Sequence, residues 1–171
     1  MILLTHSPLP LCSLQHSSQH TTTRYGPRQD PKSAYSGVIS LFMDKANAGD
    51  VVGVLGDGAQ TRDFVYVKDI ARAIITAMKS PSCAMDVFNV CTGRHITVQE
   101  LAKTVVRLFG GKSKIENRKP RDGDIRISEC DPSKAREKLG FVAQTDVETG
   151  LGHTRDWFKL PKARQGDLKT H

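Results

Sequence analysis

Short apolar segments with the character of β-strands alternate with segments of helical periodicity along most of this chain. Residues 51–55 and 64–67 are apolar runs of strand length, whereas residues 33–48 carry apolar side chains at helical spacing. Gly49 follows the helical segment and is a typical helix stop. Because strands that alternate with helices pack in layers, the pattern predicts an α/β chain with one hydrophobic core.

Helix caps give the clearest local predictions. Thr97 and Glu100 form the pattern of a capping box, in which each residue satisfies a free amide at the start of the helix. The helix that they open is expected to end at Gly110. The other expected elements are a helix capped by Asp69 and ending before Pro81, a strand at 87–91, a helix capped by Asp131 and closed by Gly140, and a helix from Thr145 to Trp157 or Phe158.

The charge balance points to an anionic partner. Lys and Arg number 25 against 18 Asp and Glu, for a net charge of +7, and phosphate is the obvious candidate. No apolar stretch is long enough for a transmembrane helix, so no membrane is expected. The four cysteines form no C-x-x-C pair, which argues against a zinc site or a disulfide framework and favours a reducing, cytoplasmic setting.

The two ends of the chain differ from its middle. Residues 1–23 contain no charged side chain, and we expect residues 1–24 to be a loose leader outside the domain at 25–160. Residues 161–171 are expected to form a basic polar tail. His16 and His20 have the spacing of a helical metal pair, but the residues between them are poor helix formers and no third ligand is evident. No metal site is therefore predicted.

A glycine-rich stretch, Gly53-x-x-Gly56-x-Gly58, imitates the loop that binds dinucleotide phosphates. Such a loop needs a following helix, whose N-terminus faces the pyrophosphate. Here the next residues have the pattern of another strand, so the glycines are interpreted as a hairpin turn. No cofactor-binding residue is predicted in this chain.

Five motifs follow one another along the chain: Tyr25-Gly-Pro-Arg-Gln-Asp-Pro31, Tyr35-Ser-Gly-Val-Ile-Ser40, Gly56-Asp-Gly-Ala-Gln-Thr-Arg-Asp-Phe-Val-Tyr-Val-Lys-Asp69, Phe88-Asn-Val-Cys-Thr-Gly93 and Pro120-Arg-Asp-Gly-Asp-Ile-Arg126. In this order they resemble the C-terminal part of the extended short-chain dehydrogenase/reductase family. Within it they are most similar to NAD-dependent nucleotide-sugar epimerases and dehydratases, especially UDP-glucose and UDP-N-acetylglucosamine 4-epimerases. The resemblance covers about Tyr25 to Phe158 and implies the C-terminal substrate-binding part of an extended Rossmann-type fold.

The resemblance also implies a reaction, in which bound NAD removes hydride from sugar C4 and returns it to the opposite face. The family's base is a tyrosine in a Y-x-x-x-K motif, beside a lysine that lowers its pKa. None of Tyr25, Tyr35 and Tyr66 has a lysine four residues later, and the N-terminal dinucleotide half is missing. We therefore expect no catalytic residue here and no NAD binding by this chain alone.

The resemblance implies that this chain contributes the residues that bind a UDP-sugar. Arg62 and Arg121 match two arginines that bind the diphosphate, and Asp124 matches an acid that accepts hydrogen bonds from ribose hydroxyls. The competing interpretation of Arg62 is an ion pair with Asp57 or Asp63. For Arg121 and Asp124 it is a solvated charged turn.

Three further positions are candidates for the same site. Val38 and Val54 fall in segments that line the nucleotide site in relatives. The alternative for both is a place in the hydrophobic core. Ser128 stands where a small side chain would leave room for an N-acetyl group, and the alternative is ordinary strand packing.

The predicted function is the nucleotide-sugar-binding portion of an NAD-dependent UDP-sugar 4-epimerase, without activity on its own. The alternatives are a dehydratase or decarboxylase fragment, or a non-catalytic basic binding module. Nucleic acid is not an expected partner, because the motifs supply no basic face interleaved with aromatic residues. The resemblance implies that complete relatives are homodimers and leaves the oligomeric state of this chain open.

Overall fold

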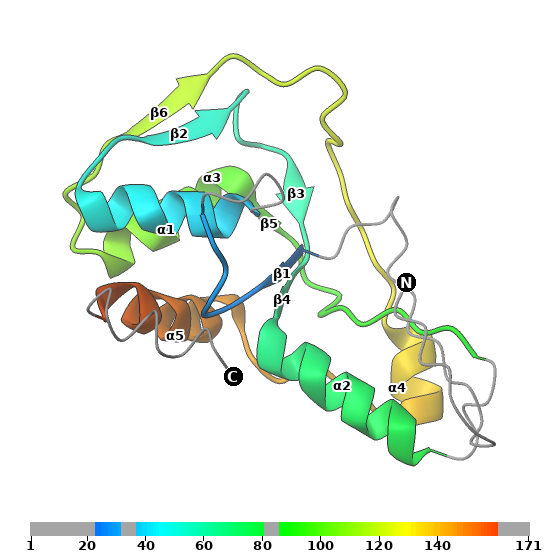
Figure 1. Ribbon diagram of the computed structural model, residues 1–171. Coiled ribbons are helices and arrows are strands. Elements are labelled where there is room, and N and C mark those ends of the chain that lie inside the picture. Colours follow the sequence, from blue (N-terminus) through cyan, green and yellow to red (C-terminus); the bar gives the residue numbers. More distant parts are fainter. Residues whose placement is uncertain (1–22, 32–36, 81–85, 161–171) are drawn as a thin grey trace.

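The computed structural model describes residues 23–31, 37–80 and 86–160, which form helices and short strands in alternation (Figure 1). The expected α/β class is confirmed. The strands are β1 (Thr23–Tyr25), β2 (Val52–Leu55), β3 (Thr61–Arg62), β4 (Phe64–Tyr66), β5 (Ile96–Thr97) and β6 (Ile115–Arg118), and the helices are α1 (Val38–Ala48), α2 (Val67–Lys79), α3 (Val98–Leu108), α4 (Ser133–Leu139) and α5 (Val147–Lys159).

The strands pair two by two in the part of the chain that the structure describes. β1 pairs with β4 and β2 with β6, both in parallel, whereas β3 and β5 are antiparallel. The β2–β6 pair lies over α1 and α3, and α5 lies on the opposite side of α1 from that pair (Figure 1). This arrangement buries one face of β2 and leaves its other face free.

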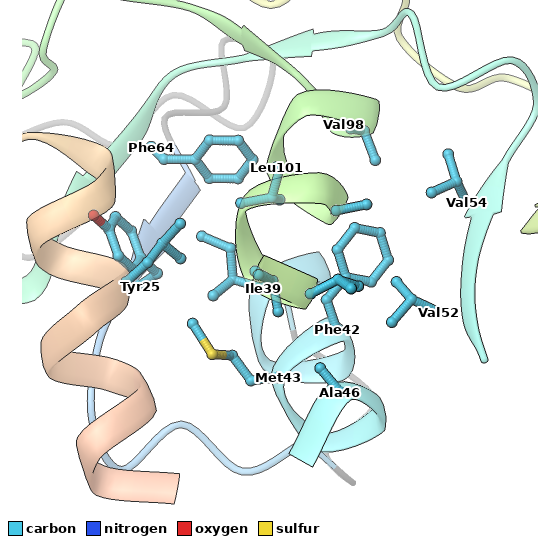
Figure 2. Packing of buried hydrophobic residues seen from close by; sticks show 14 of the residues in the cluster. Tyr25, Ile39, Phe42, Met43, Ala46, Val52, Val54, Phe64, Val98 and Leu101 are labelled. Carbon is cyan, nitrogen blue, oxygen red and sulfur yellow. The ribbon is translucent and has the colours of Figure 1, made fainter. Parts of the chain in front are cut away.

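The main hydrophobic core fills the space between these helices and the strands β1, β2 and β4. Figure 2 shows Val52 and Val54 pointing from β2 toward Phe42 and Val98. Tyr25 closes the core on the α5 side, where its hydroxyl donates to the backbone oxygen of Val147 at 3.2 Å. Burial raises the pKa of this phenol, so Tyr25 is a packing residue held neutral.

A second, smaller core lies between α2 and α4. Ala73 and Ala77 of α2 contact Phe88, Leu139 and Phe141 there. The expected strand at 87–91 is wrong, because these residues form no strand ladder and only Val87 among them takes part in an isolated β-bridge. The apolar side chains of this segment are nevertheless buried, because Phe88 and Cys91 are both at most 1% exposed.

The capping box at the start of α3 is confirmed. The Thr97 hydroxyl accepts from the Glu100 amide at 3.0 Å, and a Glu100 carboxylate oxygen accepts from the Thr97 amide at 2.8 Å. α1 likewise ends where expected, with Gly49 in the left-handed conformation at φ 74°. These signals act within one helical turn, which is why the sequence alone reveals them.

Three other predicted caps need correction. α2 begins at Val67, with Tyr66 as its N-cap, so Asp69 lies inside the first turn and does not cap the helix. α4 has Pro132 as its N-cap, and Asp131, one residue earlier, accepts from the Ser133 amide at 2.9 Å. α5 begins one residue later than a Thr145 cap would require: Asp146 is the N-cap and accepts from the Thr149 amide at 2.9 Å. In all three places the helix itself is where the sequence pattern predicts it.

The expected leader at 1–24 also needs a correction at its end. Thr23 and Arg24 belong to β1, where they pair with Phe64 and Val65 of β4. The Thr23 amide donates to the backbone oxygen of Asp63 at 2.8 Å. The rest of the expected leader, including His16 and His20, lies outside the described residues, as does the tail at 161–171.

Asp69 joins α2 to the loop before α5 and gives a testable prediction about stability. It is 3% exposed and accepts hydrogen bonds from Arg72 at 2.6 Å, from the Thr145 amide at 2.9 Å and from the Gln144 amide at 3.2 Å. Burial opposes its charge, but these hydrogen bonds outweigh burial and lower the pKa of Asp69. Asp69→Asn is expected to reduce the free energy of unfolding at pH 7 by about 1–3 kcal/mol, because an amide nitrogen would face donors.

The pH dependence of this loss has a definite sign. Since the pKa of Asp69 is lower in the folded state, its contribution is present above the unfolded value of about 4 and is lost as the pH falls through the folded value. Urea unfolding at pH 7 and pH 3 measures this, and the gap between wild type and Asp69→Asn should narrow at pH 3. The exposed Glu137→Gln is the control, and a gap that is equal at both pH values would contradict the assignment.

Candidate functional site

A cavity of about 800 Å³ lies between α1, β2 and the segment at 118–124. The α1 side of its wall is mixed, because apolar Val38, Leu41 and Phe42 lie there beside the charged Asp44 and Lys45. The side formed by the segment at 118–124 is charged. The lining residues are Thr23, Gly37, Val38, Leu41, Phe42, Asp44, Lys45, Asp50, Val51, Gly53, Leu55, Gln60, Arg62, Val98, Arg118, Arg121 and Asp124. Val38, Arg62, Arg121 and Asp124, four of the six candidates from the sequence, are therefore gathered around one cavity.

The alternation of side chains along β2 decides which of its residues face the cavity. Val52 and Val54 are fully buried in the core, so Gly53 and Leu55 project to the other face and line the cavity. Val54 is 0% exposed and has no surface there. Val54 is thus a core residue that does not line this cavity, whereas Leu55 does. This agrees with the alternative interpretation of Val54 as hydrophobic core.

Arg62 is the most tightly held charged residue of the cavity. Its side chain is 14% exposed, and its Nη2 donates to Asp124 Oδ1 at 2.8 Å. Its Nη1 donates to the backbone oxygens of Thr61 at 2.7 Å and Ile125 at 2.6 Å. Arg62 thus fixes the position of Asp124 and of the chain beside it.

The competing ion pairs for Arg62 are not formed. Asp57 pairs instead with Arg126, at 2.8 Å between Oδ2 and Nη2. The Ala59 amide and the Arg126 guanidinium lower the pKa of Asp57. Asp63 is 1% exposed and accepts hydrogen bonds from the amides of Thr92 and Gly93, so it anchors a loop on the far side of β4.

Arg121 and Asp124 frame the turn at the charged end of the cavity. The Asp124 amide donates to the Arg121 backbone oxygen at 3.2 Å, and Gly123 adopts φ 77°, a conformation that favours glycine. The Arg121 side chain is exposed and lines the cavity. The turn is solvated, as the alternative interpretation holds, and it also faces the cavity.

Ser128 does not reach this cavity. It is 4% exposed and lies beyond the point where Thr61 bridges to Ile127. It is not among the residues that line the cavity. A role for Ser128 in making room for a sugar substituent remains a prediction of the resemblance alone.

Several lining residues were missed at the sequence level. Lys45 of α1 pairs with Asp50 at 3.1 Å, and Gln60 donates to the Leu55 backbone oxygen at 3.0 Å. Arg118 lies at the end of β6, beside β2. Gln60 falls inside a motif quoted above but was given no role there, and no motif marks Lys45 or Arg118. The pairing of β2 with β6 and the packing of α1 bring these two to the cavity.

A second cavity of about 580 Å³ adjoins the first at its charged end. The two share Leu55, Gln60, Arg118, Arg121 and Asp124. Arg126 lines only the second cavity, where it is paired with Asp57. Arg118 and Arg121 therefore lie where the two cavities meet.

The glycine-rich stretch after β2 does not fit a dinucleotide. Residues 59–66, which follow Gly58, contain β3 and β4, and the next helix begins only at Val67. These residues therefore lack the helix N-terminus that would face a pyrophosphate, as predicted. The predicted hairpin is wrong, however, because β2 pairs with β6 and β3 with β5.

The tyrosines and the metal-binding residue types form no further site in the part of the chain that the structure describes. Tyr25 and Tyr66 are 2% exposed core residues, and Tyr35 lies outside that part of the chain. Over residues 23–31, 37–80 and 86–160, His, Cys, Asp and Glu side chains form no group of three that could hold a metal ion. Over the same ranges, no helix has the length and apolar character needed to cross a membrane.

Comparison with known proteins identifies similar chains. The model of the NAD-dependent epimerase/dehydratase family matches residues 16–91, which begins before Tyr25, the expected start of the resemblance. A UDP-glucose 4-epimerase of Mycolicibacterium smegmatis is 36% identical over 135 residues, covering 79% of this chain and 42% of the relative.

Solved structures give the same result. The UDP-glucose 4-epimerase of Thermotoga maritima with UDP-glucose superposes with a TM-score of 0.76 at 39% identity, over 80% of this chain and 43% of that one. The UDP-glucose 4-epimerase of Thermus thermophilus in complex with NAD gives a TM-score of 0.70 at 31% identity, over 80% and 44%. This chain thus spans less than half the length of the relatives it matches.

Proposed function

Because the chain belongs to the NAD-dependent epimerase/dehydratase family, we propose that its cavity binds the nucleotide part of a UDP-sugar. The observation that carries the proposal is the convergence of Val38, Arg62, Arg121 and Asp124 on one cavity, from three separate segments of the chain. A wall that carries apolar side chains, next to a cationic end, suits a ligand with a flat base and an anionic diphosphate. The relative from Thermotoga maritima carries UDP-glucose, which supports the same ligand class.

The proposed roles follow from the donors that each residue has left. Arg121 presents its guanidinium to the cavity and would bind diphosphate oxygens with a two-pronged geometry. Arg62 uses both Nη1 hydrogens and one Nη2 hydrogen within the protein, so Nε and the second Nη2 hydrogen remain for a ligand. Asp124 accepts from Arg62 through Oδ1 and would use Oδ2 for ribose hydroxyls.

The proposed whole activity is 4-epimerisation of a UDP-sugar. NAD would supply the hydride acceptor and donor for sugar C4 in a protein that also contains a dinucleotide-binding half. The residues of this chain would hold the diphosphate and the nucleoside and thereby fix the sugar at one end. They would perform no proton transfer, because none of its tyrosines is followed by a lysine at the required spacing.

Calorimetric titration of UDP into the chain tests the proposed binding. Wild type should bind UDP, and Arg121→Ala should weaken binding about 10- to 150-fold, since a charge-assisted hydrogen bond contributes about 1.5–3 kcal/mol. Lys112→Ala, an exposed change that also removes one positive charge away from the cavity, is the control. A wild type that does not bind UDP, or an Arg121→Ala variant with unchanged affinity, would refute the proposal.

A further inference from the structure

Arg118 lies on the cavity face of the β2–β6 pair. In this parallel pair Arg118 is the Cα partner of Leu55, and Glu116 is the partner of Gly53. Paired residues in neighbouring strands project to the same face of a sheet. Since Gly53 and Leu55 face the cavity, Arg118 faces it as well, and it lines both cavities at their junction.

Gly53 leaves the room in which the Arg118 side chain lies. A Cβ at position 53 would lie 2.5 Å from Arg118 Nε and 2.8 Å from its Cδ. Any residue with a side chain would therefore displace the guanidinium. This close approach gives a reason for a glycine at position 53 that does not involve a dinucleotide. Because Gly53 has no side chain, the Arg118 guanidinium can lie against the strand.

The cations around the cavity are not equivalent. Lys45 is paired with Asp50 and Arg62 with Asp124, so these two are largely neutralised within the protein. Arg118 and Arg121 form no ion pair with any carboxylate of the described residues. Two arginines without an ion pair, Arg118 and Arg121, thus line both cavities.

We propose that Arg118 is a specificity-determining residue of the cavity that binds, with Arg121, the second phosphate group of a nucleoside diphosphate. The inference rests on the proposed function and names one more contact for the same ligand. One guanidinium fork matches one phosphate group, and two adjacent forks match a diphosphate. Arg118 therefore makes the site prefer a nucleoside diphosphate to a monophosphate.

Titration of UDP, UMP and uridine into wild type and Arg118→Ala tests this inference. Arg118→Ala should weaken UDP binding about tenfold or more, weaken UMP binding much less and leave uridine binding unchanged. The ratio of UDP to UMP affinity therefore falls. Lys119→Ala, an exposed neighbour outside both cavities, removes the same charge and should keep the wild-type ratio.

A second variant tests the packing of Arg118 on Gly53. Gly53→Ala alone should lower the ratio of UDP to UMP affinity, because the added methyl group displaces the guanidinium. Added to Arg118→Ala, it should change UDP affinity no further, since the displaced group is already gone. Circular dichroism and the unfolding midpoint verify that each variant is folded.

The outcomes separate this inference from the proposed function. If wild type binds UDP but Arg118→Ala binds it equally well, or loses UDP, UMP and uridine to the same degree, the inference is overturned and UDP binding stands. A wild type that does not bind UDP overturns the proposed function and the inference together. A selective loss of UDP affinity in Arg118→Ala, with Lys119→Ala unchanged, supports the inference.

Discussion

Replacing Arg62 by alanine is expected to lower the free energy of unfolding by about 1–3 kcal/mol and to weaken UDP binding about 10- to 150-fold. The loss of stability follows from the three groups that Arg62 holds: Asp124 and the backbone oxygens of Thr61 and Ile125. The loss of affinity follows because Asp124 and its turn are no longer fixed at the cavity. Lysine at this position should restore only part of the stability and of the affinity, since it restores the positive charge but not the paired N–H donors of the planar guanidinium.

Arg126→Ala is the matched control for this prediction. Arg126 also pairs with an aspartate, Asp57, but the two side chains are 65% and 57% exposed. An exposed pair of this kind contributes about 1 kcal/mol or less. Urea unfolding and UDP titration on both variants measure the contrast, and an Arg62→Ala variant that matches Arg126→Ala in stability and affinity would show that Arg62 is an ordinary surface pair.

The second large effect is an absence of catalysis. Incubated with NAD and either UDP-glucose or UDP-N-acetylglucosamine, the 171-residue chain is expected to form no C4 epimer and to show no measurable NAD affinity. The physical reason is that the sequence has no Tyr-x-x-x-Lys pair to act as a base, and that no glycine-rich turn leads into a helix within residues 23–31, 37–80 and 86–160.

Chromatography of the sugar nucleotides and titration of NAD measure this result. A complete UDP-glucose 4-epimerase under the same conditions serves as the positive control. Formation of the epimer by the chain alone would mean that other residues act as the base, and the proposed division of roles would then be wrong.

Signals confined to one helical turn could be read from the sequence. The capping box of Thr97 and Glu100 and the stop at Gly49 are local, and the structure has both as predicted. Asp69 shows the limit of such reasoning. It has the character of a cap, but the backbone amides of Gln144 and Thr145 bind it together with Arg72. Arg72 is a local partner at i+3, whereas no local rule foresees the two amides, which lie 75 and 76 residues further along the chain.

The sequence predicted most of the residues that gather at the candidate site, but only part of their arrangement. The motif resemblance provided Val38, Arg62, Arg121 and Asp124, which the structure gathers around one cavity. The direct ion pair of Arg62 with Asp124 was not foreseen, because the pairing of β3 with its neighbours determines which carboxylate comes within reach.

Val54 illustrates a second limit. The alternation along β2 is clear from its sequence, but which face is covered depends on where α1 and α3 pack. A sequence shows that side chains alternate between the two faces of a strand, but it does not show which face packs against the core. Leu55 and Arg118 were overlooked for the same reason.

The pairing of β2 with β6 also bears on how the molecule acquires its cavity during folding. The two strands are separated in the chain by β3, β4, β5, α2 and α3, so paired residues such as Leu55 and Arg118 lie 63 positions apart. Contacts of this kind require long loops to close, and they tend to form slowly. Since Arg118 and Leu55 come together only through this pairing, we expect the cavity to be absent from a partly folded chain in which the helices are intact but β2 and β6 are still apart.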